Sequence, residues 1–165
     1  MAALTAGTKA PDFTLFGLDG SKFSLQEALR RGPVLAAFFK ISCPVCQYAF
    51  PFFERLHKAH GGQKVTIVGI SQDNPRDTAA FLKEYGVTFP TLLDDPNGYA
   101  VSNAYGLTNV PTVFLIAQDG SIEISSVGWV KQDIKQLNAK LASAHQAAMP
   151  VLFKPGEDIR DFRAG

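Results

Sequence analysis

Three short apolar segments, separated by stretches with helical features, most strongly constrain how this chain can fold. The segments are residues 33–39, 64–70 and 112–117, and each is rich in valine, isoleucine or phenylalanine without regular polar alternation. Strands that are covered on both faces show this pattern. The stretches 44–60 and 75–86 begin with proline, and glycine stands at or just after their ends, as is typical of helices. The alternation predicts an α/β fold.

The third apolar segment leads into a predicted hairpin. The Asp-Gly pair at 119–120 favours a tight turn, and apolar residues return within 123–129, so these segments should pair as antiparallel strands. A last helix is expected from residue 132. Its apolar face would consist of Ile134, Leu137 and Leu141. We therefore predict a three-layer α/β/α sandwich with a central mixed β-sheet.

The chain is predicted to form one domain over residues 1–145, because no linker, repeat or low-complexity segment divides its 165 residues. Residues 146–165 should form an extended tail, since Pro150 and Pro155 interrupt helical periodicity. We expect four apolar side chains to hold this tail against the surface: Val151, Leu152, Phe153 and Phe162. A tail that binds a partner is the alternative.

Charge and hydropathy exclude some classes of partner. The 16 Lys and Arg residues against 15 Asp and Glu give a net charge of +1 without like-charge runs, so nucleic acid is not expected to bind. No apolar run approaches the roughly 18 residues of a membrane span. The N-terminal sequence lacks the pattern of a secretory leader, which favours a cytoplasmic location, or a periplasmic or other extracytoplasmic one if a signal peptide preceded residue 1.

The only two cysteines, Cys43 and Cys46, stand in the turn between the first predicted strand and the helix 44–60. The amides and dipole at a helix N-terminus stabilise a thiolate, which points to Cys43 as a nucleophile. Cys46 lies one turn further on, where it could resolve a mixed disulfide formed by Cys43. This interpretation needs a reversible Cys43–Cys46 disulfide and no metal or organic cofactor.

The cysteine pair allows two other interpretations. Both could be small buried residues, although a strand-to-helix turn is an unusual place for that. A metal site shared with His57 and His60 is disfavoured, because eleven helical residues separate Cys46 from His57 by roughly 16 Å, whereas zinc ligands lie within about 2.3 Å of the ion. The histidines, with His145, are instead expected at the surface near helix ends.

Several segments together resemble the redoxin branch of the thioredoxin superfamily, which includes the AhpC/TSA proteins and the TlpA-like thiol-disulfide oxidoreductases. The resemblance spans about residues 5–142. Its marks are GTKAPDFTLFGLDGSKFSL at 7–25, FFKISCPVCQ at 38–47, VGISQD at 68–73 and YGLTNVPTVFLIAQDG at 105–120, together with Pro51 in the helix. The resemblance implies a thioredoxin-like fold, thiol-disulfide oxidoreductase activity centred on the CPVC motif, and a role in cell redox homeostasis.

The resemblance also implies a substrate groove beside the cysteines. Its residues would be Pro44, Val45, Val110, Pro111, Gly128 and Trp129, with a cis Val110–Pro111 peptide exposing its backbone to an extended substrate. Trp129 would line the groove, the alternative being an ordinary core tryptophan, and Lys40 could stabilise the Cys43 thiolate. Expected partners are protein or small-molecule thiols and disulfides and a reductant such as a thioredoxin-type system. The oligomeric state is left open.

The sequence departs from the family pattern at positions that bear on the proton acceptor for Cys46 and on peroxidase activity. Ala37, Ser42 and Ala49 stand where relatives place tuning groups, so the proton acceptor for Cys46 is not identified. Neither cysteine follows the Pro-x-x-x-Thr/Ser-x-x-Cys pattern of peroxiredoxins. A thiol-dependent peroxidase of the antioxidant type is therefore a weaker alternative, and a non-enzymatic binding module with this fold is another.

Overall fold

The computed structural model describes residues 2–165. Its strands are β1 (Thr14–Gly17), β2 (Lys22–Ser24), β3 (Val34–Phe39), β4 (Thr66–Ser71), β5 (Thr91–Leu93), β6 (Thr112–Ile116), β7 (Ile122–Val127), β8 (Trp129–Val130) and β9 (Phe162–Arg163). Its helices are α1 (Leu25–Leu29), α2 (Pro44–His60), α3 (Pro75–Glu84), α4 (Ala100–Ala104) and α5 (Lys131–Ala144). Within residues 2–165, no helix has both the length and the apolar character that crossing a membrane requires.

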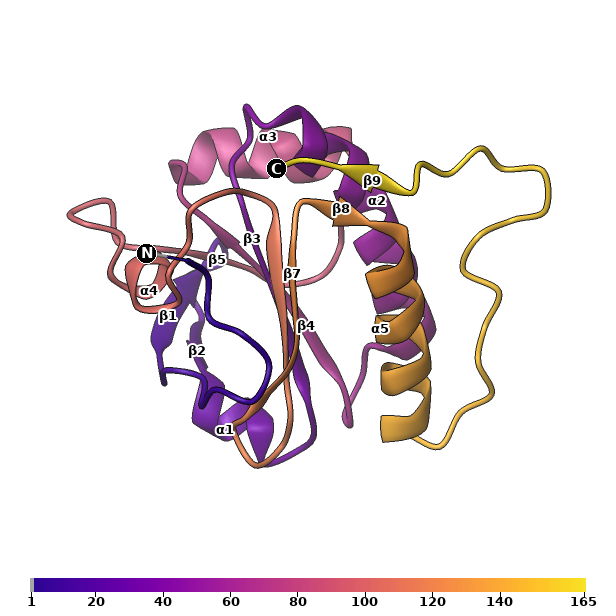
Figure 1. Cartoon of the computed structure of the whole chain (residues 1–165). Coiled ribbons are helices and arrows are strands. Elements are labelled where there is room, and N and C mark those ends of the chain that lie inside the picture. The colour runs from indigo at the N-terminus through magenta and orange to yellow at the C-terminus, as the bar shows by residue number, and fades with distance from the viewer. Residues whose placement is uncertain (1) are drawn as a thin grey trace.

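Seven strands form one mixed sheet in the order β2-β1-β5-β4-β3-β6-β7, and helices lie on both of its faces (Figure 1). The three apolar segments became the neighbouring strands β4, β3 and β6 at its centre. β3 runs parallel to β4 and antiparallel to β6, and β6 pairs with β7 as the predicted hairpin. The predicted α/β/α sandwich with a mixed sheet is confirmed.

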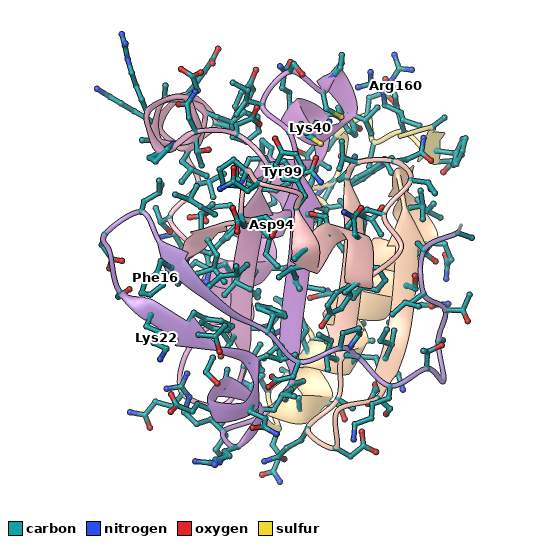
Figure 2. The ribbon with its side chains drawn as sticks, turned by 90° about the vertical axis from the view of Figure 1, so that its left-hand side faces the viewer. Phe16, Lys22, Lys40, Asp94, Tyr99 and Arg160 are labelled. Atoms are coloured by element: carbon teal, nitrogen blue, oxygen red, sulfur yellow. The ribbon has the colours of Figure 1, made fainter. Side chains whose placement is uncertain are left out.

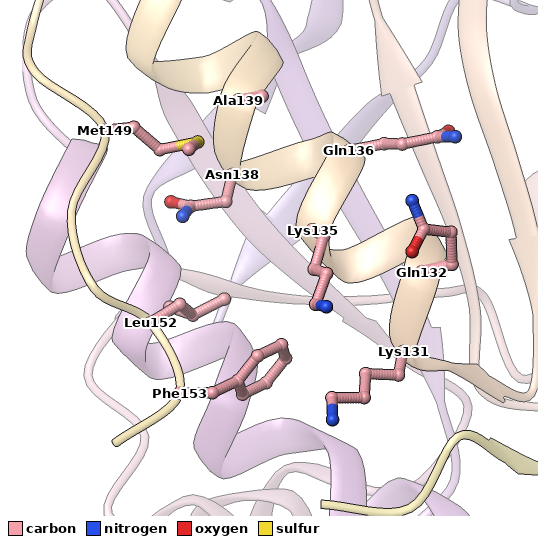
Figure 3. A pocket seen from close by; sticks show the side chains of 9 residues that line it. All are labelled: Lys131, Gln132, Lys135, Gln136, Asn138, Ala139, Met149, Leu152 and Phe153. Carbon is pink, nitrogen blue, oxygen red and sulfur yellow. The ribbon is translucent and has the colours of Figure 1, made fainter. Parts of the chain in front are cut away.

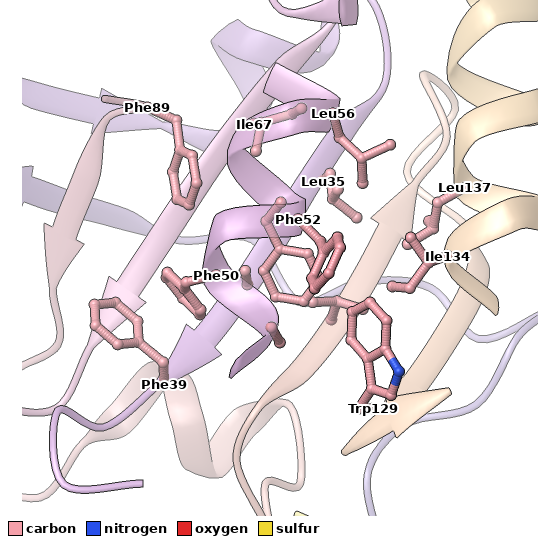
Figure 4. Packing of buried hydrophobic residues seen from close by; sticks show 14 of the residues in the cluster. Leu35, Phe39, Phe50, Phe52, Leu56, Ile67, Phe89, Trp129, Ile134 and Leu137 are labelled. Atoms are coloured by element: carbon pink, nitrogen blue, oxygen red, sulfur yellow. The ribbon is translucent and has the colours of Figure 1, made fainter. Parts of the chain in front are cut away.

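The fully buried strand β3 supplies side chains to two cores, one on each face of the sheet. Leu35 and Phe39 pack with α2 and α5, whereas Val34 and Phe38 pack with α1 on the other face. Figure 4 shows the first core, in which aromatic rings of α2 such as Phe50 lie against the sheet. Each fully buried side chain of this size contributes about 1.5–3 kcal/mol. The central strand is therefore rigidly fixed, and the turn at its end is held from both sides.

The helices begin and end as their sequences indicate. Cys43 is the N-cap of α2, Pro44 occupies its first turn, and the helix ends before Gly61. Helix α3 ends at Glu84, slightly before the predicted limit. The predicted face of α5 is buried against the core, as the three side chains Ile134, Leu137 and Leu141 show.

Residues 146–165 form an extended strap along α5 and α2 that returns to the sheet edge near β8 (Figure 1). Leu152 is buried as expected, but Val151 and Phe162 are 79% and 62% exposed, so their predicted contacts are wrong. The neighbouring Phe153 also packs against this core, as predicted, so the strap turns Leu152 and Phe153 inward and Val151 outward. Ile159 provides a second buried contact that was not predicted.

Polar contacts tie the strap to both helices. The Arg55 guanidinium of α2 donates to the Leu152 carbonyl oxygen at 3.0 Å and pairs with both carboxylate oxygens of Glu157. The hydrogen bond from Arg55, followed by that from the Lys154 backbone N–H, holds the pKa of the Glu157 carboxyl below its usual value, at about 2. The Asn138 amide of α5 donates to the Pro150 carbonyl oxygen at 3.0 Å. These contacts fix the path of the strap up to its last residues.

The histidines do not all lie at the surface. His60 is buried, with its Nε2 atom 2.8 Å from Asn138 Oδ1 and its Nδ1 atom 2.8 Å from His145 Nε2, so the predicted surface position is wrong for His60. The cause is that the ends of α2 and α5 pack together. Helix α2 is continuous, as the distance argument against a shared metal ion assumed. No cluster of three or more metal-ligating side chains occurs within residues 2–165.

A cavity of about 560 Å³ lies between α5 and the strap (Figure 3). Lys131 and Lys135 of α5 face the apolar side chains of Met149, Leu152 and Phe153 across it. Neither cysteine lines this cavity. It is therefore separate from the sulfur chemistry described below.

Candidate functional site

The two cysteines lie where the central strand β3 passes into α2. The Cys43 sulfur accepts a hydrogen bond from the backbone N–H of Cys46 at 3.1 Å and so caps the helix with its own side chain. This sulfur sits at the positive end of a helix of 17 residues. Both the hydrogen bond and the helix dipole stabilise a thiolate more than a thiol.

The turn before α2 is held by a carboxylate that the sequence analysis did not identify. Asp73, just beyond β4, accepts the backbone N–H of Ile41 at 2.8 Å. The Gln47 side chain donates to the Ile41 carbonyl oxygen at 3.0 Å, and the Cys43 N–H donates to the Lys40 carbonyl oxygen at 3.3 Å. Asp73 was visible only as the last residue of VGISQD, because its partner Ile41 is 32 positions away.

The cis peptide expected at Val110–Pro111 is confirmed. It places the Val110 carbonyl oxygen 3.3 Å from the Cys43 sulfur, close enough to accept a hydrogen bond from the thiol. Residues from two distant segments therefore meet at the Cys43 sulfur. Neither the turn between β3 and α2 nor the segment before β6 that contains Val110 would form this site alone.

The two cysteines differ in how far their side chains are exposed. Cys43 is partly exposed, whereas Cys46 is fully buried. Burial raises the pKa of the Cys46 thiol far above its ordinary value, and its hydrogen bond with Cys43 and the negative charge of Asp73 raise it further. Cys43 is thus the sulfur that a substrate can reach, and Cys46 is held as a neutral thiol.

The positions that differ from the family pattern supply no carboxylate to Cys46. Ala37 and Ala49 are fully buried beside the pair, and Ser42 is exposed. Asp73 is the carboxylate whose charge acts on Cys46. In this chain a negative charge therefore reaches the buried thiol from the end of β4 rather than from β3 or α2.

The raised pKa of Cys46 predicts that resolution of a mixed disulfide depends strongly on pH. Below this pKa the thiolate fraction grows about tenfold per pH unit, so release of a thiol from a preformed Cys43 mixed disulfide should accelerate nearly as steeply between about pH 6 and 9. Rapid-quench measurement of the released thiol tests this. A rate that does not change with pH would contradict a buried thiol as the attacking group.

Asp73→Asn provides a matched variant for the same measurement. Asparagine keeps an oxygen that can accept the Ile41 N–H but removes a negative charge that adds a small part to the raised pKa of Cys46, most of which comes from burial. The pKa of Cys46 should fall, and release should become faster at each pH. Slower release would instead assign Asp73 a role in accepting the proton.

The groove residues occupy different environments. Pro44 is exposed and Val45 is buried. Lys40, which was predicted to modulate the thiolate, is exposed, and Figure 2 shows it at the same end of the molecule as Arg160. The role of Lys40 as a thiolate modulator stays a prediction.

Trp129 does not line an open groove. Its side chain is fully buried, packs against Tyr48 and Phe52, and donates from Nε1 to the Arg160 carbonyl oxygen at 2.6 Å. The prediction of a groove-lining side chain is therefore wrong, because the strap covers the indole. Only the backbone of Trp129 and Gly128 lies next to residues 163–165, which in turn approach the Val110 carbonyl oxygen.

Known proteins are similar to this chain in sequence and in fold. The profile of the AhpC/TSA family matches residues 6–125. The thiol-disulfide oxidoreductase ResA of Geobacillus thermodenitrificans is 32% identical over 136 residues, which cover 81% of this chain and 76% of ResA.

Solved structures agree with the fold. The thioredoxin domain of a thiol-disulfide oxidoreductase from Bacteroides vulgatus has a TM-score of 0.73 at 23% identity, covering 84% of this chain and 98% of that domain. Peroxidoxin BcpB from Mycobacterium tuberculosis has a TM-score of 0.69 at 24% identity, covering 87% and 97%. At these identities both structures support the fold alone. With the profile match and the ResA relative, they lead to one conclusion: this chain belongs to the AhpC/TSA family and is a thiol-disulfide oxidoreductase.

Proposed function

We propose that Cys43 and Cys46 carry out this exchange with protein disulfides and dithiols. The Cys43 thiolate attacks one sulfur of a substrate disulfide, forming a mixed disulfide and expelling the first substrate thiolate, which takes up a proton. The Cys46 thiolate then attacks the Cys43 sulfur, closing the Cys43–Cys46 disulfide and expelling the second substrate thiolate. Two electrons pass from the protein to the substrate, and the reverse sequence oxidises a substrate dithiol.

The observation that carries this proposal is the asymmetry of the two sulfurs. Cys43 is partly exposed and accepts the Cys46 N–H at 3.1 Å, whereas Cys46 is fully buried. An incoming disulfide can therefore reach only the first sulfur. The second is adjacent along the same helical turn, so its attack is intramolecular and excludes competing thiols.

The substrate class follows from what lies beside Cys43. The Val110 carbonyl oxygen is 3.3 Å from the sulfur, and a backbone acceptor at this position suits an extended peptide better than a compact molecule. A protein disulfide in an extended segment is thus the proposed substrate. A thioredoxin-type system is the proposed source of electrons when the protein acts as a reductant.

Equilibration in redox buffers tests the proposal. We expect the protein to lose and regain two hydrogens reversibly as the potential moves between roughly −120 and −300 mV, the span of known thiol-disulfide proteins. Mass spectrometry after acid quenching and alkylation measures the oxidised fraction. A protein that stays in one form throughout would be a binding module, and consumption of hydrogen peroxide as fast as disulfide reduction would favour a peroxidase.

A further inference from the structure

The last described residues of the chain lie along the edge next to the cysteines. β9 pairs antiparallel with β8, with Arg163 opposite Trp129 and Phe162 opposite Val130. The Lys131 N–H donates to the Asp161 carbonyl oxygen at 2.8 Å and continues this pairing. Figure 1 shows the strap ending above the sheet, near the start of α2. An extended segment of this chain therefore already occupies the edge.

Residues 163–165 approach the backbone of Gly128 and Val110 closely. Gly128 has a φ of +75°, and a Cβ atom there would lie 2.5 Å from the Arg163 carbonyl oxygen and 2.8 Å from the Gly165 nitrogen. A Cβ atom on Gly165 would lie 2.7 Å from the Val110 carbonyl oxygen. Only residues without side chains allow approaches this close. The Asn109 amide also donates to the Gly165 carbonyl oxygen at 3.0 Å.

The segment and the nucleophile share one oxygen atom. The Val110 carbonyl oxygen that contacts Gly165 is the same atom that lies 3.3 Å from the Cys43 sulfur. An extended substrate that presents a disulfide to Cys43 would pass Val110, whose carbonyl oxygen lies beside the sulfur. That path is the one residues 162–165 now follow.

The contacts that keep the C-terminal segment in place are polar, and they are stronger at Arg160 than at residues 162–165. Arg160 is fixed, since its N–H donates to the Tyr48 hydroxyl at 3.1 Å and its carbonyl oxygen accepts the Trp129 indole N–H. Beyond it, the Arg163 guanidinium stacks over the Tyr48 ring at 5.2 Å, but Phe162 is 62% exposed. Residues 162–165 thus bury little apolar surface and can separate without releasing the strap behind them.

We propose that residues 162–165 are an internal ligand of the peptide-binding groove and compete with extended disulfide substrates. The proposal rests on the function proposed above. It also defines the ligand that the groove accepts: an extended peptide with a cationic side chain over Tyr48 and a residue without a side chain against Val110. Residues 126–165 lie outside the segment that the family profile matches, so the profile does not describe the segment 162–165 that contacts Val110.

The size of the effect follows from tethering. A short tether gives an effective concentration on the order of millimolar. If the free peptide binds with a dissociation constant of about 0.1 mM, the tethered segment weakens substrate binding about tenfold.

Ending the chain after Asp161 tests the competition while keeping the Arg160 and Asp161 contacts. We expect kcat/KM for an extended peptide disulfide to rise about tenfold, and kcat/KM for 2-hydroxyethyl disulfide, which needs no groove, to change less than twofold. An unchanged or lower value for the peptide would overturn the proposal, because the segment would then be inert or part of the substrate site.

A pair of point variants provides a test without deletion. Gly165→Val forces a side chain against the Val110 oxygen and should raise kcat/KM for the peptide disulfide nearly as much as the truncation. Ala148→Val introduces the same side chain at an exposed position elsewhere on the strap and should leave kcat/KM unchanged. Equal kcat/KM values for the two variants would contradict the idea that displacing residues 162–165 opens the site to substrate.

Binding can be measured without turnover, which separates this proposal from the proposed function. A fluorescein-labelled peptide of residues 162–165, FRAG, should bind the truncated protein that carries Cys43→Ser. It should bind the full chain that carries Cys43→Ser at least tenfold more weakly. A scrambled peptide is the control. No binding, or equal binding to both proteins, would overturn the internal-ligand proposal. Failure of disulfide exchange in both unmutated proteins would overturn only the proposed function.

Discussion

Replacing Cys43 with serine is expected to reduce disulfide exchange at least about a thousandfold, since a serine hydroxyl stays protonated where a thiol ionises. The helix cap should survive, because the serine oxygen can also accept the Cys46 N–H. The measurement is the initial rate of reduction of a peptide disulfide, with folding checked by circular dichroism. Ser42→Ala, at the exposed neighbouring position, is the matched control and should keep nearly full activity.

Cys46→Ser should behave differently from Cys43→Ser although the two residues stand in one helical turn. Its first step, attack by Cys43, remains, so a mixed disulfide should accumulate to one equivalent and be visible by mass spectrometry. The same variant should retain bound partners in cells, which identifies the substrates. Equal loss of mixed disulfide in the two variants would contradict the assignment of Cys43 as nucleophile and Cys46 as resolving thiol.

Replacing Trp129 with alanine should have the largest effect on stability among the residues around the site. The indole is fully buried against Tyr48, Phe52 and Phe153 and donates a hydrogen bond to Arg160. Its removal leaves a cavity and is expected to lower the free energy of unfolding by about 3–5 kcal/mol. Urea denaturation of the reduced protein, followed by circular dichroism, measures the change.

Trp129→Phe separates packing from hydrogen bonding at the same position. A phenyl ring keeps most of the contacts with Phe52 but leaves the Arg160 carbonyl oxygen without its donor. The expected loss is smaller, about 1–3 kcal/mol. A loss below about 1 kcal/mol for Trp129→Ala would mean that the strap, rather than the indole, covers the core at this edge.

The central strands could be predicted because their sequences are unambiguous, and the shortest elements could not. β3 is a run of apolar residues that is buried on both faces, which periodicity alone detects. β5 has only three residues and follows Pro90, so its strand character comes from pairing with β1 and β4. The short helix α4 begins after Tyr99 in a left-handed conformation, which no local pattern indicates.

The side-chain environments were less predictable than the elements that carry them. Trp129 follows a glycine at the end of the hairpin, a position equally compatible with an exposed groove wall and a buried core residue. Burial was decided by Arg160 and the strap, which are separated from Trp129 by helix α5. In the same way, Asp73 and Ile41 are far apart in sequence and meet only because β3 and β4 run parallel.

By itself, the sequence determined the chemistry: two cysteines spaced by one helical turn, a proline that begins their helix and a strand that ends beside them. These are local features, because helix capping and hydrophobic periodicity act over a few residues. The tertiary structure decided how reactive each sulfur is and what lies in front of it. Burial of Cys46, the charge of Asp73 and the return of residues 162–165 to Val110 all depend on contacts between distant segments, which packing of the whole chain alone creates.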